Sequence, residues 1–175
     1  MPAMRPIATL LILVPSLALA QVKAHRLAAG LTSNGFDFRT QGDLTTVGLG
    51  VGALGYYALT DMFQLGGNID FTVNSSTISV GKVSSTSTTT AFVFRPALKV
   101  NFMPNQKLNF WAGALAGFVA GNTSAFDVEI RGGVEYFLSP DWAVTAYPDL
   151  DINVPFQGPT GIGLGIHYGL LVYFQ

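Results

Sequence analysis

The chain has 175 residues, of which 11% are charged, and its formal net charge at pH 7 is −1. Ordinary soluble domains contain about 25% charged residues, so the composition argues against a large water-facing surface. No basic excess indicates nucleic acid as a partner. The absence of cysteine excludes disulfides, thiolate catalysis and cysteine-ligated zinc.

Residues 1–20 have the features of a secretory signal peptide. Arg5 supplies the positive charge, the apolar run 7–19 is too short to span a bilayer, and Ala18-Leu19-Ala20 resembles a cleavage site. An uncleaved membrane anchor is the alternative, but no cationic flank follows the apolar run. Cleavage after Ala20 leaves 21–175 as one domain, in which no run of about 18 apolar residues predicts a transmembrane helix.

Apolar and polar residues alternate in eight runs along this domain, which is the period of a β-strand. Runs of about ten residues have the length of a tilted membrane-spanning strand. In the fourth run, for example, Phe94, Leu98 and Phe102 alternate with Arg95 and Lys99. In chain order the predicted strands are 24–32, 45–57, 62–74, 83–102, 107–120, 126–137, 142–152 and 161–174.

The predicted connections alternate between short and long. Each short connection contains Pro, Asn or Asp, which favour turns; these connections are 58–61, 103–106 and 138–141. The long connections are polar and comprise 33–44, 75–90, 121–125 and 153–160.

Within the stretch 75–90, Gly81-Lys82 is predicted to form a type II′ hairpin turn. The third and fourth strands then pair so that Asn68 faces Arg95. Pro96 and Pro148 conflict with strand interiors, because a proline leaves a ladder hydrogen bond unmade. They predict either β-bulges or strand ends.

Alternation alone leaves open whether water or lipid lies outside the barrel. The polar face is rich in Gly, Ala, Thr and Asn, which suit a narrow interior better than a solvated surface. Large aromatic residues of the apolar face lie beside the short turns, as in a membrane-interface girdle. These are Tyr57, Phe63, Phe102, Phe110, Tyr136, Trp142 and Phe174. We therefore predict an all-β fold, an eight-stranded antiparallel up-and-down transmembrane β-barrel.

The segments GLGVGALGYY (48–57), YFLSPDWAV (136–144) and GIGLGIHYGLLVYF (161–174) resemble the small outer-membrane β-barrel proteins of the OmpA, OmpX and opacity-protein type. The resemblance implies location in a bacterial outer membrane, with membrane lipid as a partner. It also implies insertion by the barrel-assembly machinery, which reads a terminal aromatic strand. Such barrels usually end on the aromatic residue itself, whereas here Gln175 follows Phe174.

Ten residues are predicted to form a charge network in the lumen: Arg26, Asp70, Arg95, Lys99, Glu129, Arg131, Glu135, Asp149, Asp151 and His167. Centring the sixth and seventh strands on Pro140 places Arg131 opposite Asp149 and Glu129 opposite Asp151. Because unpaired charge in a narrow lumen is costly, these groups should pair and close the barrel. The lumenal charge cluster of the OmpA type agrees with this salt-bridge plug. A narrow charged path for ions is the alternative.

No catalytic residue, metal site or cofactor is predicted. His167 could act as a base, as in outer-membrane lipid hydrolases, but no serine accompanies it, and His25 stands alone near the other end. One acidic group could bind a divalent cation through oxygen, although we expect it to be a solvated rim; it comprises Asp127, Glu129, Asp149 and Asp151.

The sequence thus predicts an integral outer-membrane barrel with a structural or surface-interaction role and no catalysis. Extracellular ligands would contact the loops 33–44 and 75–90. Two alternatives remain. One is a narrow porin-like channel for ions or small solutes. The other is a secreted soluble barrel that binds an apolar ligand inside and has its two faces inverted.

Overall fold

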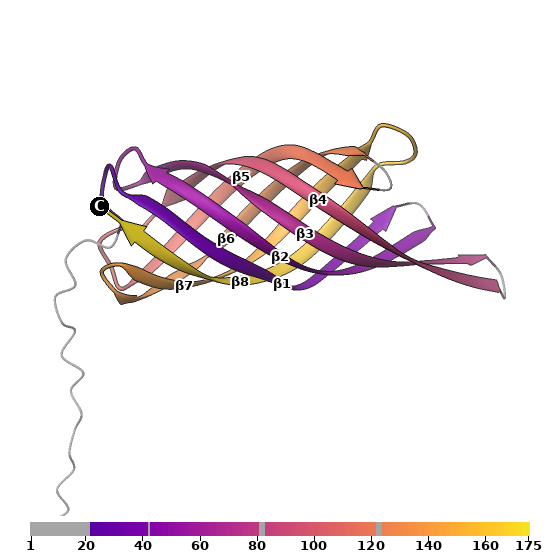
Figure 1. The fold of residues 1–175 in the computed structure, drawn as a ribbon, viewed down its shortest axis with the longest axis horizontal. Helices are drawn as coiled ribbons and strands as arrows, with labels where there is room; N and C mark the ends of the chain where they lie inside the picture. The colour runs from indigo at the N-terminus through magenta and orange to yellow at the C-terminus, as the bar shows by residue number, and fades with distance from the viewer. Residues whose placement is uncertain (1–21, 42, 81–82, 122–123) are drawn as a thin grey trace, which may run out of the picture.

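The computed structural model describes residues 22–41, 43–80, 83–121 and 124–175, so the predicted signal peptide lies outside the described residues. Eight antiparallel strands form a closed barrel in which β1 pairs with β8, as Figure 1 shows. The strands are β1 Leu27–Gln41, β2 Leu44–Ala58, β3 Phe63–Val80, β4 Val83–Asn101, β5 Leu108–Gly121, β6 Ala125–Ser139, β7 Trp142–Pro155 and β8 Gly161–Phe174. The predicted all-β, eight-stranded barrel is confirmed.

Side chains alternate between the interior and the outer surface along the strands. On β7, Val144 and Leu150 are exposed on the outside, whereas Tyr147 and Asp149 are buried inside. The outer surface is therefore apolar and the interior largely polar. The alternative of a soluble barrel that binds an apolar ligand inside is therefore wrong, because it requires an apolar interior and a polar outer surface. Among the described residues, no helix has the length and hydropathy needed to cross a membrane.

The first strand differs from the prediction. The sequence predicts it at 24–32, with a loop over 33–44, but β1 runs from Leu27 to Gln41 and pairs with β2 up to its last residue. A bulge between Asn34 and Asp37 shifts the register against β2. An extra residue reverses the inward and outward phase of the alternation. A prediction that follows one uninterrupted alternation therefore ends the strand near the bulge and makes it too short.

The hairpin of β3 and β4 has the predicted register. Asn68 pairs with Arg95, Gln64 with Lys99, and Val80 with Val83, while the turn residues 81 and 82 lie outside the described part of the chain. The polar stretch 75–90 is therefore not an open loop: its described residues continue the two strands, as the predicted hairpin requires. The hairpin projects beyond the rest of the barrel (Figure 1).

Shortening this hairpin is expected to leave the barrel folded. Removing residues 76–87 and joining Ser75 to Thr88 through Asn-Gly keeps a cross-strand pair at the new turn. The deleted β4 residues pair with β3 but with no described residue of β5. The refolded variant should keep the heat-dependent shift in gel mobility that a closed barrel shows. Loss of this shift, with the parent chain as control, would show that the hairpin is needed for closure.

Pro96 and Pro148 lie inside β4 and β7, so neither ends a strand. Neither marks a bulge: the β4–β5 register is the same before and after Pro96, and the β6–β7 register is the same on both sides of Pro148. Instead, the ladder is interrupted beside each proline on one side only, next to β5 and β6 respectively. The missing N–H therefore costs one local gap in the ladder.

The short connections and the C-terminus lie at the same end of the barrel (Figure 1), which we call the turn end. Residues 22–26 fold over this end: Val22 N donates to Pro104 O at 3.1 Å, and His25 N donates to Ala58 O at 2.7 Å. His25 has a φ of 64°, which turns the chain into β1. A buried apolar cluster occupies the interior toward the turn end; it comprises Val22, Ala28, Leu54, Tyr56, Ala58, Ala97, Leu115, Phe137, Ala143, Leu171 and Tyr173.

Candidate functional site

All ten residues of the predicted charge network are buried in the barrel interior. Arg26 lies apart from the others. It closes the turn end, where its guanidinium contacts Asp141 at 2.5 Å and the carbonyl oxygens of Pro140 and Tyr173 at 3.0 Å. The other nine occupy two layers of the lumen, one near the turn end and one near the end that carries the long hairpin, which we call the loop end.

The layer nearer the turn end is built around Lys99 and Glu135. These two ion-pair with each other, and their side chains are 2% and 1% exposed. The Lys99 ammonium lies 5.3 Å from the ring centre of Tyr56 and 5.0 Å from that of Trp111, within reach of a cation–π interaction. Tyr173 Oη donates to Glu135 at 3.1 Å. Both charges are thus compensated within the interior.

The layer nearer the loop end is held by Arg95 and Arg131. Arg95 contacts Asp127 at 2.6 Å, Asp70 at 2.9 Å and Glu129 at 3.3 Å, so one guanidinium links three carboxylates from two strands. Arg131 ion-pairs with Glu129. These groups satisfy the requirement that buried charges be paired and hydrogen-bonded.

The predicted register between β6 and β7 is correct, but the ion pairs differ from it. Arg131 pairs with Asp149 and Glu129 with Asp151 along the ladder. Arg131 nevertheless binds Glu129 on its own strand, and Asp151 binds Arg39 of β1. The Arg131 guanidinium also lies 5.0 Å from the ring centre of Tyr147, which holds it along the strand.

Glycines on β8 explain how β1 and β7 meet across it. Gly163 stands between Arg39 and Asp151 in the ladders, and a Cβ built there would lie 1.8 Å from Asp151 Oδ1. The absence of a side chain at Gly163 thus leaves space for the Arg39 and Asp151 side chains to meet. The glycines at every second position of β8 face the interior, where their lack of side chains leaves space for the side chains of β1 and β7.

Three charged residues of the lumen, Asp37, Arg39 and Asp127, are absent from the network predicted from the sequence. Asp37 and Arg39 fall in a predicted loop, and only a bulge in β1 places them on the inward face. Asp127 falls in the predicted acidic rim. The prediction of a solvated rim is wrong, because Asp127 is fully buried and Glu129, Asp149 and Asp151 are also buried. In a narrow barrel, inward carboxylates near the loop end are covered by side chains of the opposite wall.

Small voids remain between these layers in the described part of the barrel. Cavities of about 30 Å³ and about 10 Å³ border the His167 and Lys99 groups, respectively. A wider vestibule of about 410 Å³ opens at the loop end, lined in part by Arg39, Asn74 and Thr89.

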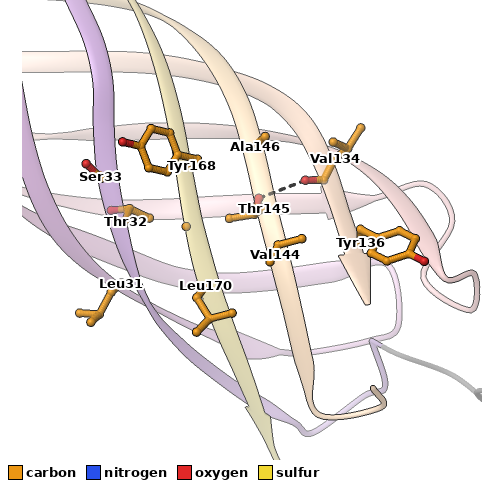
Figure 2. A pocket seen from close by; sticks show the side chains of 11 residues that line it. Leu31, Thr32, Ser33, Val134, Tyr136, Val144, Thr145, Ala146, Tyr168 and Leu170 are labelled. Carbon is orange, nitrogen blue, oxygen red and sulfur yellow. Dashed lines mark hydrogen bonds between the residues drawn. The ribbon is translucent and has the colours of Figure 1, made fainter. Parts of the chain in front are cut away.

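The predicted membrane-interface aromatics all lie on the outer surface near the turn end, and their side chains are between 41% and 57% exposed; they are Tyr57, Phe63, Phe102, Phe110, Tyr136, Trp142 and Phe174. A shallow outer groove of about 570 Å³ runs from β1 across β8 and β7 to β6. Figure 2 shows Leu31 and Leu170 at one side of it and Tyr136 at the other. Its apolar lining suits contact with lipid chains.

Comparisons with known proteins agree with this architecture. A family model described as "Outer membrane protein beta-barrel domain" matches residues 7–169. No curated protein matches the chain. Among solved structures, Neisserial surface protein A is 10% identical with a TM-score of 0.67, covering 85% of this chain and 97% of its own. OprG from Pseudomonas aeruginosa is 9% identical with a TM-score of 0.64, covering 89% and 99%. At such identities, the two structures share the fold alone.

Proposed function

The chain belongs to the outer membrane protein β-barrel family, and from this we propose that it is a closed barrel that acts through its extracellular rim. Its place is the bacterial outer membrane, where the apolar outer surface contacts lipid. In this orientation the turn end faces the periplasm and the loop end faces outward. We propose that the barrel-assembly machinery inserts the chain and that its aromatic β8 supplies the recognition signal.

The observation that carries this proposal is the filling of the lumen. The two charged layers leave cavities of only about 30 Å³ and 10 Å³, roughly the space of one water molecule or less. Below them, apolar side chains such as Phe137 and Leu171 close the turn end. A hydrated ion has no open path through this packing. The same observation disfavours the narrow porin-like channel.

We propose no catalysis in the interior. His167, the buried candidate base, contacts Asn34 and Asp149. In the described part of the chain, its ring nitrogens make no hydrogen bond to a serine or threonine hydroxyl. A nucleophile must lie within hydrogen-bond reach of its base.

The surface-interaction role is supported by the edge of the projecting hairpin. Residues 84–90 of β4 pair with β3, while no described strand pairs with their other side. Such an edge presents main-chain donors and acceptors to an added strand. Their side chains are serines and threonines that add hydrogen bonds. We propose this edge, in preference to residues 33–41 of β1, as the contact for an extracellular ligand.

Conductance in a planar lipid bilayer tests the closed lumen. The refolded wild-type chain is expected to show no unitary current. The double variant Arg131→Ala, Phe137→Ala removes one side chain from the charged layer and one from the apolar cluster, so it should admit ions. Lys107→Ala, which removes an exposed charge at a short turn, should stay silent. A steady current from the wild type would instead make the buried charges a selectivity filter.

A further inference from the structure

Three buried side chains from three neighbouring strands converge at one point of the lumen. They are Glu129 on β6, Asp149 on β7 and His167 on β8, and their candidate ligand atoms all lie within 4.8 Å of one another. From the sequence, the two carboxylates are expected in a solvated acidic rim, with a divalent cation bound through oxygen alone as the alternative. The structure adds an imidazole to them and removes them from solvent. We propose that these three residues bind a divalent transition-metal ion.

The orientation of His167 supports this site. Its Nδ1 lies 2.8 Å from Asn34 Oδ1, which accepts the Nδ1–H, so in the neutral imidazole the lone pair is on Nε2. The ring is stacked on Tyr147, with centroids 4.9 Å apart and planes inclined by 4°. A metal-binding histidine usually has its other nitrogen held by such a partner. The imidazole is thus fixed with Nε2 directed toward the carboxylates.

The atoms that face each other in this site have no hydrogen-bond partner. His167 Nε2 and Asp149 Oδ1 are 3.2 Å apart, yet neither makes a hydrogen bond of acceptable geometry among the described residues. With a neutral imidazole, the two buried lone pairs that face each other repel, and leaving them unsatisfied is costly. A cation between them would satisfy both.

The backbone leaves space for the ion. Gly165 of β8 lies between Asp37 and Asp149 in the ladders. A Cβ built on it would lie 2.2 Å from Asp149 Oδ1 and 2.8 Å from His167 Nε2. Both ligand atoms therefore point into the space that a side chain would fill. The adjoining cavity of about 30 Å³ is lined by the same three residues, and it is large enough for one bound water.

The charge of this layer also favours a cation. Among the described residues that line it, six carboxylates face three guanidinium groups, a formal excess of three negative charges. The carboxylates are Asp37, Asp70, Asp127, Glu129, Asp149 and Asp151, and the guanidinium groups are Arg39, Arg95 and Arg131. Uncompensated charge in a narrow interior is costly. One divalent ion would reduce the excess to one.

The donor set indicates the class of metal. One imidazole nitrogen with two carboxylate oxygens suits Zn²⁺ and similar first-row ions better than Ca²⁺ or Mg²⁺, which prefer oxygen alone. Arg131 and Arg95 contact the Glu129 carboxylate and orient it. With the ion bound, β6, β7 and β8 would be joined inside the lumen, and the ion would enter from the vestibule at the loop end.

Zinc binding to the refolded chain in detergent micelles tests the proposal, with titration calorimetry after treatment with a chelator. We expect one Zn²⁺ per chain. His167→Gln removes the nitrogen ligand and should weaken binding by at least about 100-fold, since loss of even an outer partner costs 10–100-fold. Gly165→Ala should weaken it similarly, because its Cβ takes the place of the ion. Co²⁺ should show a visible absorption band in wild type that both variants lack.

Matched variants serve as controls. His25→Gln changes the other histidine, which contacts Tyr57 at the turn end. Gly132→Ala adds a Cβ whose nearest neighbour is 3.9 Å away. Both should bind Zn²⁺ as wild type does, and all variants should keep the heat-dependent gel mobility. The proposal is overturned if wild type binds no Zn²⁺ at about 1 mM. It is also overturned if His167→Gln binds normally, which would place any bound ion on carboxylates alone and leave His167 paired with Asp149 through a proton.

Discussion

Replacing Lys99 with methionine is expected to lower the free energy of unfolding by about 3–5 kcal/mol. Methionine fills a similar volume but leaves the Glu135 carboxylate, 1% exposed, without its cation. Asn109 and Tyr173 still donate to Glu135 Oε2 at 3.2 and 3.1 Å, and they offset part of the loss. Urea unfolding of the chain in phospholipid vesicles, followed by tryptophan fluorescence, measures the difference.

A double variant separates loss of the ion pair from loss of packing. Lys99→Met with Glu135→Gln removes both charges and keeps an amide that can bond to Asn109 and Tyr173, so most of the stability should return. Lys107→Met is the matched control: Lys107 is exposed at a short turn and lies 5.0 Å from the ring centre of Tyr136, so its substitution should change stability by less than about 1 kcal/mol. If Lys99→Met were as stable as wild type, the pair would not be buried as described.

Replacing Leu31 with arginine is expected to destabilise the barrel in vesicles by about 2–4 kcal/mol. Leu31 is 72% exposed on the outer surface and pairs with Leu170 of β8. It lies four residues along β1 from Leu27, which pairs with Phe174 of the aromatic girdle. At about 3.3 Å per residue and a tilt of about 40°, this places it roughly 10 Å above the girdle. That is near the middle of an apolar band about 25 Å tall.

Phe156→Arg is the control for this substitution. Phe156 is 67% exposed in the connection between β7 and β8, outside the strands, so arginine there should cost less than about 1 kcal/mol. Equal effects at Leu31 and Phe156 would mean that the outer surface does not lie in hydrocarbon. The measurement is the same urea titration, which makes the two costs directly comparable.

The barrel and the direction of its faces follow from the sequence alone, because both depend on neighbouring residues. Alternation along a strand is a local property, and the turn predicted at Gly81-Lys82 sets the register of the whole β3–β4 hairpin. The position of Asn68 opposite Arg95 is therefore predictable from the amino-acid sequence, and the ladder has this pair. The β6–β7 register, with Arg131 beside Asp149, is predictable in the same way from the turn around Pro140.

The extent of β1 and the partners inside the lumen were decided only by the tertiary structure. The bulge after Asn34 reverses the phase of β1, and local alternation cannot reveal a reversal that pairing with β2 and β8 stabilises. Closure then brings side chains from strands far apart in sequence into one narrow space, as with Arg39 and Asp151. Which long side chain reaches which charge depends on the room that glycines of the intervening strand leave. Ladder register therefore predicts neighbours, whereas the closed interior selects the ion pairs.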